Sequence, residues 1–472
     1  MEKHQGSLFL QSALTLENKF NDLEQVLEWI ELKKKETNIN IQQIEINELK
    51  DWYIPEDTGN LVHKSGKFFS IEGINVKTNW GFIKEWEQPI INQPEVGILG
   101  IICKRFNGNL YFLLQAKIEP GNINFVQLSP TVQATKSNFS QVHKGKKPLY
   151  IEYFLSQKGV KVLVDQLQSE QGARFLKKRN RNIIIEIEDN IDVHPNFCWL
   201  TLAQIKKLLL YDNVINMDTR TVISCICYCI NTEIELQHFL KDGIVKTLNK
   251  EFLYSAIDTK NALHSIKSII SWFTNLKSSF ELWVKSIPLK NVKHWYRDEY
   301  SIYHKERKYF SVIAVNVIIG NREVKSWDQP LLKVDHVGII AFIIKKINGV
   351  YHFLVQAKLE AGNFDIIELA PSVQCIADNY IHSSKEEKPA FLDFVLNVDS
   401  SKIKYDTYQS EEGGRFYKEQ NRNMIIEVGD EFSTEVPEQY IWMTLNQMIT
   451  LVQFNNYFNV EARSLMSTIS FA

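Results

Sequence analysis

A lysine and a glutamate two positions apart, Lys117 and Glu119, have side chains suited to moving a proton beside an oxyanion. They end a segment whose apolar residues predict a β-strand. Residues i and i+2 of a strand project from one face, so the ammonium could stabilise an oxyanion while the carboxylate takes a proton. An exposed ion pair at the end of a strand is the alternative for the same two residues.

Hydroxyl and amide side chains follow this pair at close intervals. They are Ser129, Thr131, Gln133, Ser137 and Asn138. Such groups suit the hydroxyls of a sugar or the oxygens of a phosphate, and a loop that satisfies its own backbone is the alternative. His143 lies in the same polar stretch. Because imidazole titrates near neutral pH, His143 is a further acid/base candidate.

A basic stretch, ARFLKKRNRN, provides cations for a diphosphate. Its candidate binding residues are Arg174, Lys177, Arg179, Asn180 and Arg181. Guanidinium groups bind phosphate oxygens in bidentate geometry, and a solvated charged face is the alternative. Arg220 follows a predicted helix start at Asn216, from which it could reach a phosphate or a partner subunit.

The same features occur a second time along the chain. QAKIEPGNINFVQLSPTVQ begins at Gln115, and QAKLEAGNFDIIELAPSVQ begins 241 residues later at Gln356. The second set of candidate residues is Lys358, Glu360, Gln374, Arg415, Asn421, Arg422 and Arg463. The period is too long for a solenoid, so a whole domain has been duplicated. We expect a first repeat over residues 1–235 and a second over residues 236–472.

The two copies differ where chemistry is expected. The second copy has Ala370, Glu419 and Ser384 in place of Ser129, Lys178 and His143. We therefore expect the working pocket to use first-repeat residues, completed by the second half or by another subunit. The second pocket is expected to be vestigial or supporting.

Periodicity predicts the elements that hold these residues. Residues 16–35 predict a helix with Leu16, Phe20, Leu23, Leu27 and Ile30 on one face. Residues 96–118 predict a hairpin that turns at Asn107–Gly108, because both central residues of such a turn need positive φ. Further strands are expected at 160–167, 182–187 and 424–428, with a helix capped by Thr201. Each repeat is therefore expected to be α+β, with a hairpin-rich mixed sheet flanked by helices.

Composition limits the class of protein. The chain has 472 residues with a net charge of −2, which disfavours nucleic acid as the main partner. No apolar run reaches the length of a membrane span, so no membrane partner is expected. Six cysteines without paired spacing indicate reduced thiols and a cytoplasmic location. Cys225, Cys227 and Cys229 could form a metal cluster, but buried thiols are favoured because zinc usually takes C-x₂-C pairs.

Four stretches together resemble the sugar-nucleotide 2,3-dehydratases of deoxysugar biosynthesis, along nearly the whole chain. They are QAKIEPGNINFVQLSPTVQATKSNF, SEQGARFLKKRNRN, NMDTRTVISC and SEEGGRFYKEQNRN. The resemblance implies a homodimer in which each half has a Nudix-hydrolase-like fold. It also implies a dTDP-4-keto-6-deoxyglucose substrate and neither a metal nor a redox cofactor. The acidic Nudix box G-x₅-E-x₇-R-E-x₂-E-E-x-G, which collects Mg²⁺, does not occur in the sequence.

The implied reaction is a β-elimination. A base removes the C3 proton beside the C4 ketone, the C2 hydroxyl leaves as water, and the enol can become a 3,4-diketone. Glu119, Lys117 and His143 are the candidate catalytic residues, and a 3-ketoreductase would have to take the product. The alternatives are a nucleotide-sugar hydrolase, a non-catalytic nucleotide-sugar binding protein of Nudix-like fold, and a two-domain scaffold that binds no nucleotide.

Overall fold

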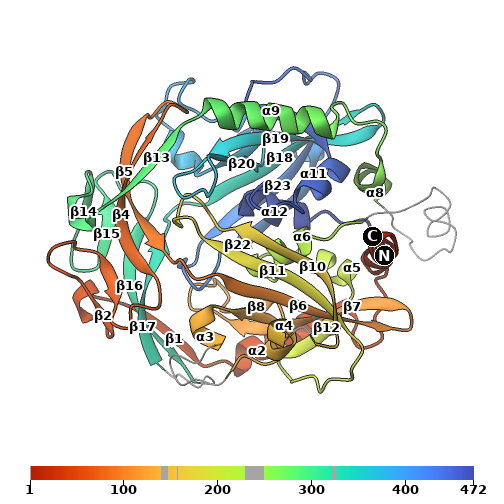
Figure 1. Ribbon diagram of the computed structural model, residues 1–472, viewed down its shortest axis with the longest axis horizontal. Helices are drawn as coiled ribbons and strands as arrows, with labels where there is room; N and C mark the ends of the chain where they lie inside the picture. The colour runs from red at the N-terminus through yellow and green to blue at the C-terminus, as the bar shows by residue number, and fades with distance from the viewer. Residues whose placement is uncertain (1, 140–146, 157, 229–248, 321–325) are drawn as a thin grey trace.

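The computed structural model describes residues 2–139, 147–156, 158–228, 249–320 and 326–472 (Figure 1). Three sequence-based predictions lie outside these ranges: the role of His143, the burial of Cys229, and the boundary between residues 235 and 236. Within the described residues, the strands form two seven-stranded and two five-stranded sheets. Each repeat supplies one large sheet.

The large sheet of the first repeat has the order β10-β11-β6-β7-β12, with β8 beside β7 and β9 beside β6. Its strands are β6 (Gly97–Phe106), β7 (Asn109–Ile118), β8 (Val126–Ser129), β9 (Val132–Ala134), β10 (Val160–Ser169), β11 (Arg179–Ile187) and β12 (Phe197–Leu200). β11 runs parallel to β6, and the other pairs are antiparallel, so the sheet is mixed as predicted. The β6–β7 turn has φ values of 49° at Asn107 and 85° at Gly108, which confirms the predicted hairpin.

The second repeat builds the same sheet in the order β20-β19-β18-β23-β22. Its strands are β18 (Gly338–Ile347), β19 (Val350–Leu359), β20 (Ile367–Ala370), β21 (Val373–Cys375), β22 (Ile403–Ser410), β23 (Gln420–Val428) and β24 (Tyr440–Thr444). The β18–β19 turn uses Asn348 and Gly349 at φ 52° and 84°. β18 and β23 form the parallel pair. The duplication read from the sequence is therefore a duplication of architecture.

Helices cover the large sheets and join them. They are α1 (Glu2–Leu14), α2 (Leu23–Glu36), α3 (Lys136–Phe139), α4 (Ile151–Ser156), α5 (Leu202–Leu208), α6 (Met217–Ser224), α8 (Lys250–Ile257), α9 (Ile266–Ser279), α10 (Leu392–Leu396), α11 (Leu445–Leu451) and α12 (Val460–Ser467). α6 and α12 pack against each other, and every residue of both helices is buried. One apolar core contains residues of both repeats, so the two large sheets share a common interior.

The two small sheets exchange an edge strand between the repeats. They contain β1 (Ile39–Ile44), β2 (Trp52–Tyr53), β3 (Leu61–His63), β4 (Ser70–Thr78), β5 (Glu85–Asn92), β13 (Leu282–Ile287), β14 (Trp295–Arg297), β15 (Ser301–His304), β16 (Ser311–Ile319) and β17 (Ser326–Lys333). β1 of the first repeat pairs with β16 of the second, and β13 of the second pairs with β4 of the first. Figure 1 shows these strands gathered on the left. Each small sheet is therefore completed by the other repeat.

The predicted helix over residues 16–35 begins later than expected. α2 starts at Leu23, because Asp22 accepts a hydrogen bond from the Gln25 backbone N–H and the Gln25 side chain accepts one from Asp22 N–H. Leu16 and Phe20 precede the helix and are each 40% exposed, so the predicted apolar face was wrong at its start. Thr201 caps α5 as predicted, accepting a hydrogen bond from the Gln204 backbone N–H.

Two features of the described residues bear on the class of protein. None of their helices is both long and apolar enough to cross a membrane. They contain no group of three or more His, Cys, Asp or Glu side chains that could hold a metal ion. Of the C-x-C-x-C thiols within this part of the chain, Cys225 is buried and Cys227 is partly buried.

Candidate active site

Loops from the two repeats meet through backbone hydrogen bonds. Gly121 N–H donates to the Gly413 carbonyl at 2.7 Å, and Lys418 N–H donates to the Gly121 carbonyl at 2.7 Å. A Cβ on Gly121 would stand 1.7 Å from the Phe416 carbonyl oxygen, so only glycine permits this approach. The reciprocal contacts join Gly362 to Gly172 and to Lys177. Each candidate pocket is consequently built from both repeats.

The first candidate group centres on Glu119, which follows β7 and is 4% exposed. Glu119 Oε1 accepts a hydrogen bond from Gln133 Nε2 at 2.7 Å and lies 3.3 Å from Lys117 Nζ. Gln133 Oε1 in turn accepts from Asn216 Nδ2 at 3.0 Å. Glu119 Oε2 is buried without a hydrogen-bond partner among the described residues. A buried carboxylate oxygen that makes no hydrogen bond within the protein is suited to accepting a proton.

The second repeat supplies the opposite wall of this group. Arg415 lies with its guanidinium carbon 4.1 Å from the centre of the Phe69 ring. Its Nε and Nη2 donate to Gln93 Oε1 at 3.1 and 3.0 Å. These contacts hold a planar cation towards Glu119, and burial lowers the pKa of Arg415 while Glu412 and Glu119 oppose that shift.

Glu412 reaches the same group from the same loop. A Cβ on Gly414 would lie 2.9 Å from Glu412 Oε1 and 3.9 Å from Glu119 Oε1. Both carboxylates therefore border Gly414. Burial raises the pKa of Glu412, and the neighbouring Arg415 opposes that shift.

Further acids surround the pair. Burial raises the pKa of Glu170 to about 7, although Asn180 Nδ2 donates to its Oε1 at 2.6 Å. Burial also raises the pKa of Asp218 well above its usual range, and Glu412 and Glu170 add to that shift. Lys178 is buried beside them and donates to the Glu95 carbonyl. The group can therefore hold protons near neutral pH.

The polar residues after Glu119 make different kinds of hydrogen bond. Gln133 belongs to the group, whereas Thr131 is buried in the sheet, where it accepts from Ile102 N–H and donates to the Leu113 carbonyl. Ser129 is buried and donates to the Pro130 carbonyl. For Ser129 and Thr131, the structure places the side chain on backbone groups and not beside Glu119. These two residues therefore follow the alternative interpretation, in which the side chains satisfy backbone groups.

Ser137 and Asn138 lie on helix α3, which follows β9. Ser137 Oγ donates to Glu95 Oε2 at 2.8 Å, which connects it to Lys178 through Glu95. Asn138 is exposed. Ser137 is therefore connected to the acid group indirectly, through Glu95 and Lys178.

The basic stretch does not form a single patch. Arg181 binds Asp165 through Nε and Nη2 at 2.7 and 2.6 Å. Arg179 lies over the Phe364 ring at 4.0 Å, and Lys177 is exposed. Asn180 orients Glu170, as described above. A diphosphate site made by the whole stretch is therefore not what the structure presents.

Arg174 was predicted for the first pocket and Arg415 for the second, but in the structure each lies beside the other group. Arg174 lies over the Phe310 ring at 4.4 Å, and it opposes the rise in pKa that burial causes at Glu419, a residue of the second group. Arg415 faces Glu119 in the first group. The correction follows from the exchanged loops, because each arginine lies on a loop that enters the other repeat.

Arg220 and Arg463 join the repeats and are each 1% exposed. Arg220 donates to Ser464 Oγ at 2.7 Å and to the Ser410 carbonyl. Arg463 donates to Thr221 Oγ1 at 3.0 Å and to the Ser169 carbonyl. Their hydrogen bonds are made within the interior, so neither side chain is placed to reach a phosphate.

The second group repeats the geometry of the first. Glu360 Oε1 accepts from Gln374 Nε2 at 3.1 Å and lies 3.4 Å from Lys358 Nζ, and Gln374 accepts from Asn459 at 2.7 Å. The other candidates in this half follow their first-repeat counterparts: Asn421 donates to Glu411, and Arg422 pairs with Asp406.

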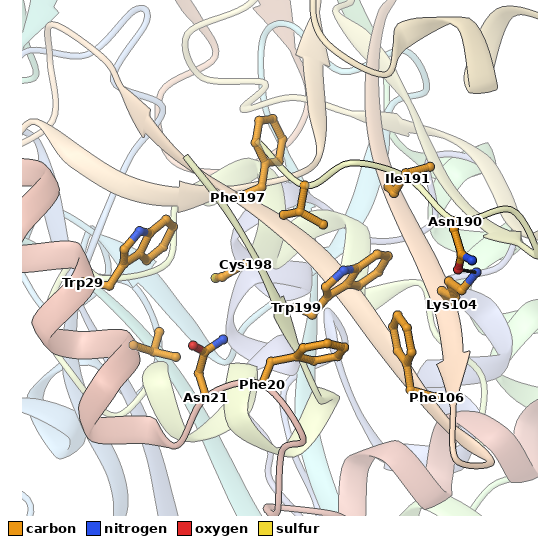
Figure 2. A pocket seen from close by; sticks show the side chains of 12 residues that line it. Phe20, Asn21, Trp29, Lys104, Phe106, Asn190, Ile191, Phe197, Cys198 and Trp199 are labelled. Atoms are coloured by element: carbon orange, nitrogen blue, oxygen red, sulfur yellow. Dashed lines mark hydrogen bonds between the residues drawn. The ribbon is translucent and has the colours of Figure 1, made fainter. Parts of the chain in front are cut away.

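Two of the cavities that described residues line lie along the first repeat. The larger, about 490 Å³, is at the β12 edge, and Figure 2 shows the rings of Trp29, Phe106, Phe197 and Trp199 around it. The described residues that line it include no Asp or Glu, so the acid–base group is elsewhere. The smaller, about 200 Å³, is lined by residues of α2 and β7 that include Lys33, Glu36 and Lys117.

Comparisons with known proteins give the family. The model of the NDP-hexose 2,3-dehydratase family matches residues 23–226 and again residues 266–469. The chain belongs to this family. A protein of Saccharopolyspora spinosa named dTDP-4-dehydro-6-deoxy-alpha-D-glucopyranose 2,3-dehydratase is 43% identical over 98% of this chain and 94% of its own length. Proteins with the same name from Amycolatopsis orientalis and Streptomyces violaceoruber are 42% and 41% identical, over 98% and 91% of this chain and 93% of each relative.

Within this NDP-hexose 2,3-dehydratase family member, sequence reasoning found Lys117, Glu119 and Gln133 but missed the residues that face them. Glu412 and Gly414 were absent from the predicted set, as were the buried acids Glu170 and Asp218. A signal was present, since the aligned segments EQGAR and EEGGR differ at two positions. What the alignment could not reveal is that each segment serves the other repeat.

Proposed function

We propose that this chain is a dTDP-4-keto-6-deoxyglucose 2,3-dehydratase, a hydro-lyase of deoxysugar biosynthesis. Membership of the NDP-hexose 2,3-dehydratase family supports the reaction, and the names of the three relatives support the substrate. The observation that carries the proposal in this chain is the buried, unpaired Oε2 of Glu119 beside the cations Lys117 and Arg415. Elimination beside a ketone needs a base and an oxyanion-stabilising charge together.

Glu119 is the proposed base. It removes the C3 proton, the electron pair enters the C3–C4 enolate, and the C4 oxygen takes negative charge. Lys117 Nζ, 3.3 Å from Glu119 Oε1, and the Arg415 guanidinium are the proposed donors to that oxygen. Loss of the C2 hydroxyl as water then gives a C2–C3 enol, which can tautomerise to the 3,4-diketone.

Each repeat is proposed to be a Nudix-like domain that has kept nucleotide-sugar binding without hydrolysis. The mixed sheet flanked by helices supports this proposal, and so does the absence of the acidic box from the sequence. On this view the chemistry needs neither a divalent metal nor a redox cofactor. A homodimer, a cytoplasmic location and supply of the product to a 3-ketoreductase remain predictions.

A direct assay tests the proposal. The purified chain is incubated with dTDP-4-keto-6-deoxyglucose, with and without a chelator, and a mass decrease of one water in the nucleotide sugar is measured. A 3-ketoreductase included in a parallel sample should trap the dione. Phosphate release that needs added Mg²⁺ would instead indicate a hydrolase, and binding without any change in mass would indicate a non-catalytic protein.

A further inference from the structure

We propose that Glu412, a residue of the second repeat, is the general acid that protonates the departing C2 hydroxyl in the first pocket. This inference rests on the proposed function. It gives the first pocket two carboxyl groups with opposite tasks: Glu119 takes the C3 proton and Glu412 gives one to the oxygen on C2.

The exchanged loop fixes Glu412 in the pocket. Its carbonyl accepts the N–H groups of Arg415 and Phe416 at 3.1 and 3.0 Å, which closes one turn of the loop. Gly413, next in the chain, accepts from Gly121 at 2.7 Å. Through Gly121, the loop that holds Glu412 is joined directly to the loop that holds Glu119.

Gly414 brings the two carboxyl groups close to one point of the backbone. A Cβ at that position would stand 2.9 Å from Glu412 Oε1 and 3.9 Å from Glu119 Oε1. A substrate that approaches Gly414 would meet both carboxyl groups. Vicinal C3–H and C2–O bonds require donor and acceptor groups around the same two carbons.

The surroundings of Glu412 suit a carboxyl group that is protonated before the reaction and ionised after it. Burial raises the pKa of Glu412, and the nearby Glu119 raises it further, so the acid form is favoured before reaction. Arg415, Lys178 and Lys117 stabilise the carboxylate that remains after the proton has left. Glu170 and Asp218 complete the titratable groups that face it, and each carries its own raised pKa.

The step balances without any further reactant. The C3–H bond breaks as Glu119 takes the proton, and the C2–O bond breaks as the oxygen takes the Glu412 proton and leaves as water. A C2–C3 double bond forms, and the C4 ketone is restored. Glu119 ends protonated and Glu412 ionised, and proton exchange with solvent returns both to their starting forms.

The second pocket lacks this acid. The residues that enter it from the first repeat are Gln171 and Ala173, at the positions of Glu412 and Gly414. A glutamine amide does not titrate, and alanine adds a methyl group where Gly414 has only a hydrogen. Among the described residues Glu360 Oε2 is buried without a hydrogen-bond partner, so that pocket retains the base but has Gln171 in place of the acid Glu412.

Glu412→Gln separates the two proton transfers. In deuterated water, the variant should still exchange the C3 hydrogen of the substrate, while water loss falls about 10²–10⁴-fold. Glu119→Gln should lose both exchange and water loss. Glu435→Gln, at an exposed position, is the control that should match the unmodified chain.

A 2-deoxy-2-fluoro substrate provides the second readout. Fluoride leaves with less help from an acid than hydroxide, so Glu412→Gln should eliminate fluoride at nearly the unmodified rate. Recovery of the rate would show that the variant is folded and lacks only the acid. The proposal is overturned if Glu412→Gln retains full water loss, or loses exchange, water loss and fluoride elimination together. An unmodified chain that neither exchanges C3 nor loses water contradicts the proposed function itself.

Discussion

The carboxylate group around Glu119 and the one around Glu360 are nearly identical on one side and different on the other. In both, a lysine and a glutamine hold one oxygen of the glutamate at closely matched distances. The wall that arrives from the opposite repeat is where they diverge, with Glu412 and Gly414 in one and Gln171 and Ala173 in the other. The two groups have therefore diverged mainly in the loop that enters each pocket from the other repeat.

Charge separates the two groups in a second way. Lys178 in the first group is replaced by Glu419 in the second. Burial raises the pKa of Glu419 to about 7 and those of Glu411 and Glu461 to about 8. The second group thus has a buried acid, Glu419, where the first has a cation, which makes it less suited to an anionic nucleotide sugar.

The largest expected difference between the groups is in the two bases. Glu119→Gln should lower kcat at least about 10³-fold, because an amide cannot take the C3 proton. Glu360→Gln should retain turnover within about threefold. Steady-state rates of water loss measure both. Equal losses would mean that the two pockets share the reaction.

The two arginines should differ next. Arg415→Ala should lower kcat about 10²-fold, because an enolate oxygen loses a preorganised cation. Arg174→Ala removes the counterpart beside Glu419 and should cost less than about threefold. Arg415→Lys keeps the charge but loses the planar set of donors that binds Gln93, so it should recover only part of the rate. Thermal melts of each variant serve as the folding control.

Stability against pH should reveal the acids of the second group. Their folded pKa values are raised above the unfolded value, so their contribution is full at low pH and is lost as pH rises through about 8. The free energy of unfolding should fall between about pH 5 and 8, by up to about 1.4 kcal/mol per pH unit for each such group. Glu461→Gln should flatten this slope, whereas Glu435→Gln at the surface should not. A slope unchanged by Glu461→Gln would show that this residue is ionised in the folded chain.

The smallest effect is expected at the loop position that differs by one methyl group. Gly414→Ala adds a Cβ 2.9 Å from Glu412 Oε1 and should lower kcat/KM severalfold as the glutamate side chain shifts. Ala173→Gly, its mirror change in the second pocket, should leave kcat/KM unaltered. Loss of activity from Ala173→Gly comparable to that from Gly414→Ala would argue against an asymmetric reaction.

Local chemistry made part of this arrangement predictable. Asn107–Gly108 fixed a hairpin and Thr201 a helix start, because each depends on neighbours within a few residues. Lys117 and Glu119 were found together for the same reason. The start of α2 was misplaced although Asp22 and Gln25 form a capping box that the sequence contains.

Long-range pairing was beyond reach of the same reasoning. An exposed strand edge accepts any suitable partner, so periodicity could not show that β1 joins β16 or that β13 joins β4. The basic stretch looked like one phosphate site, but Arg174 and Lys178 enter different pockets. Arg220 looked accessible beside a helix start, yet its partners Ser410 and Ser464 come from the other repeat.

Each repeat supplies an edge strand, β1 or β13, to the small sheet of the other. This exchange explains why a repeat whose pocket catalyses no reaction would persist. Deleting either copy, or recombining it with a foreign one, would strip an edge from the survivor's small sheet and expose unpaired amide and carbonyl groups. The two halves are thus inherited as one unit. Drift can erode chemistry in one of them, while selection for folding alone keeps its backbone in place.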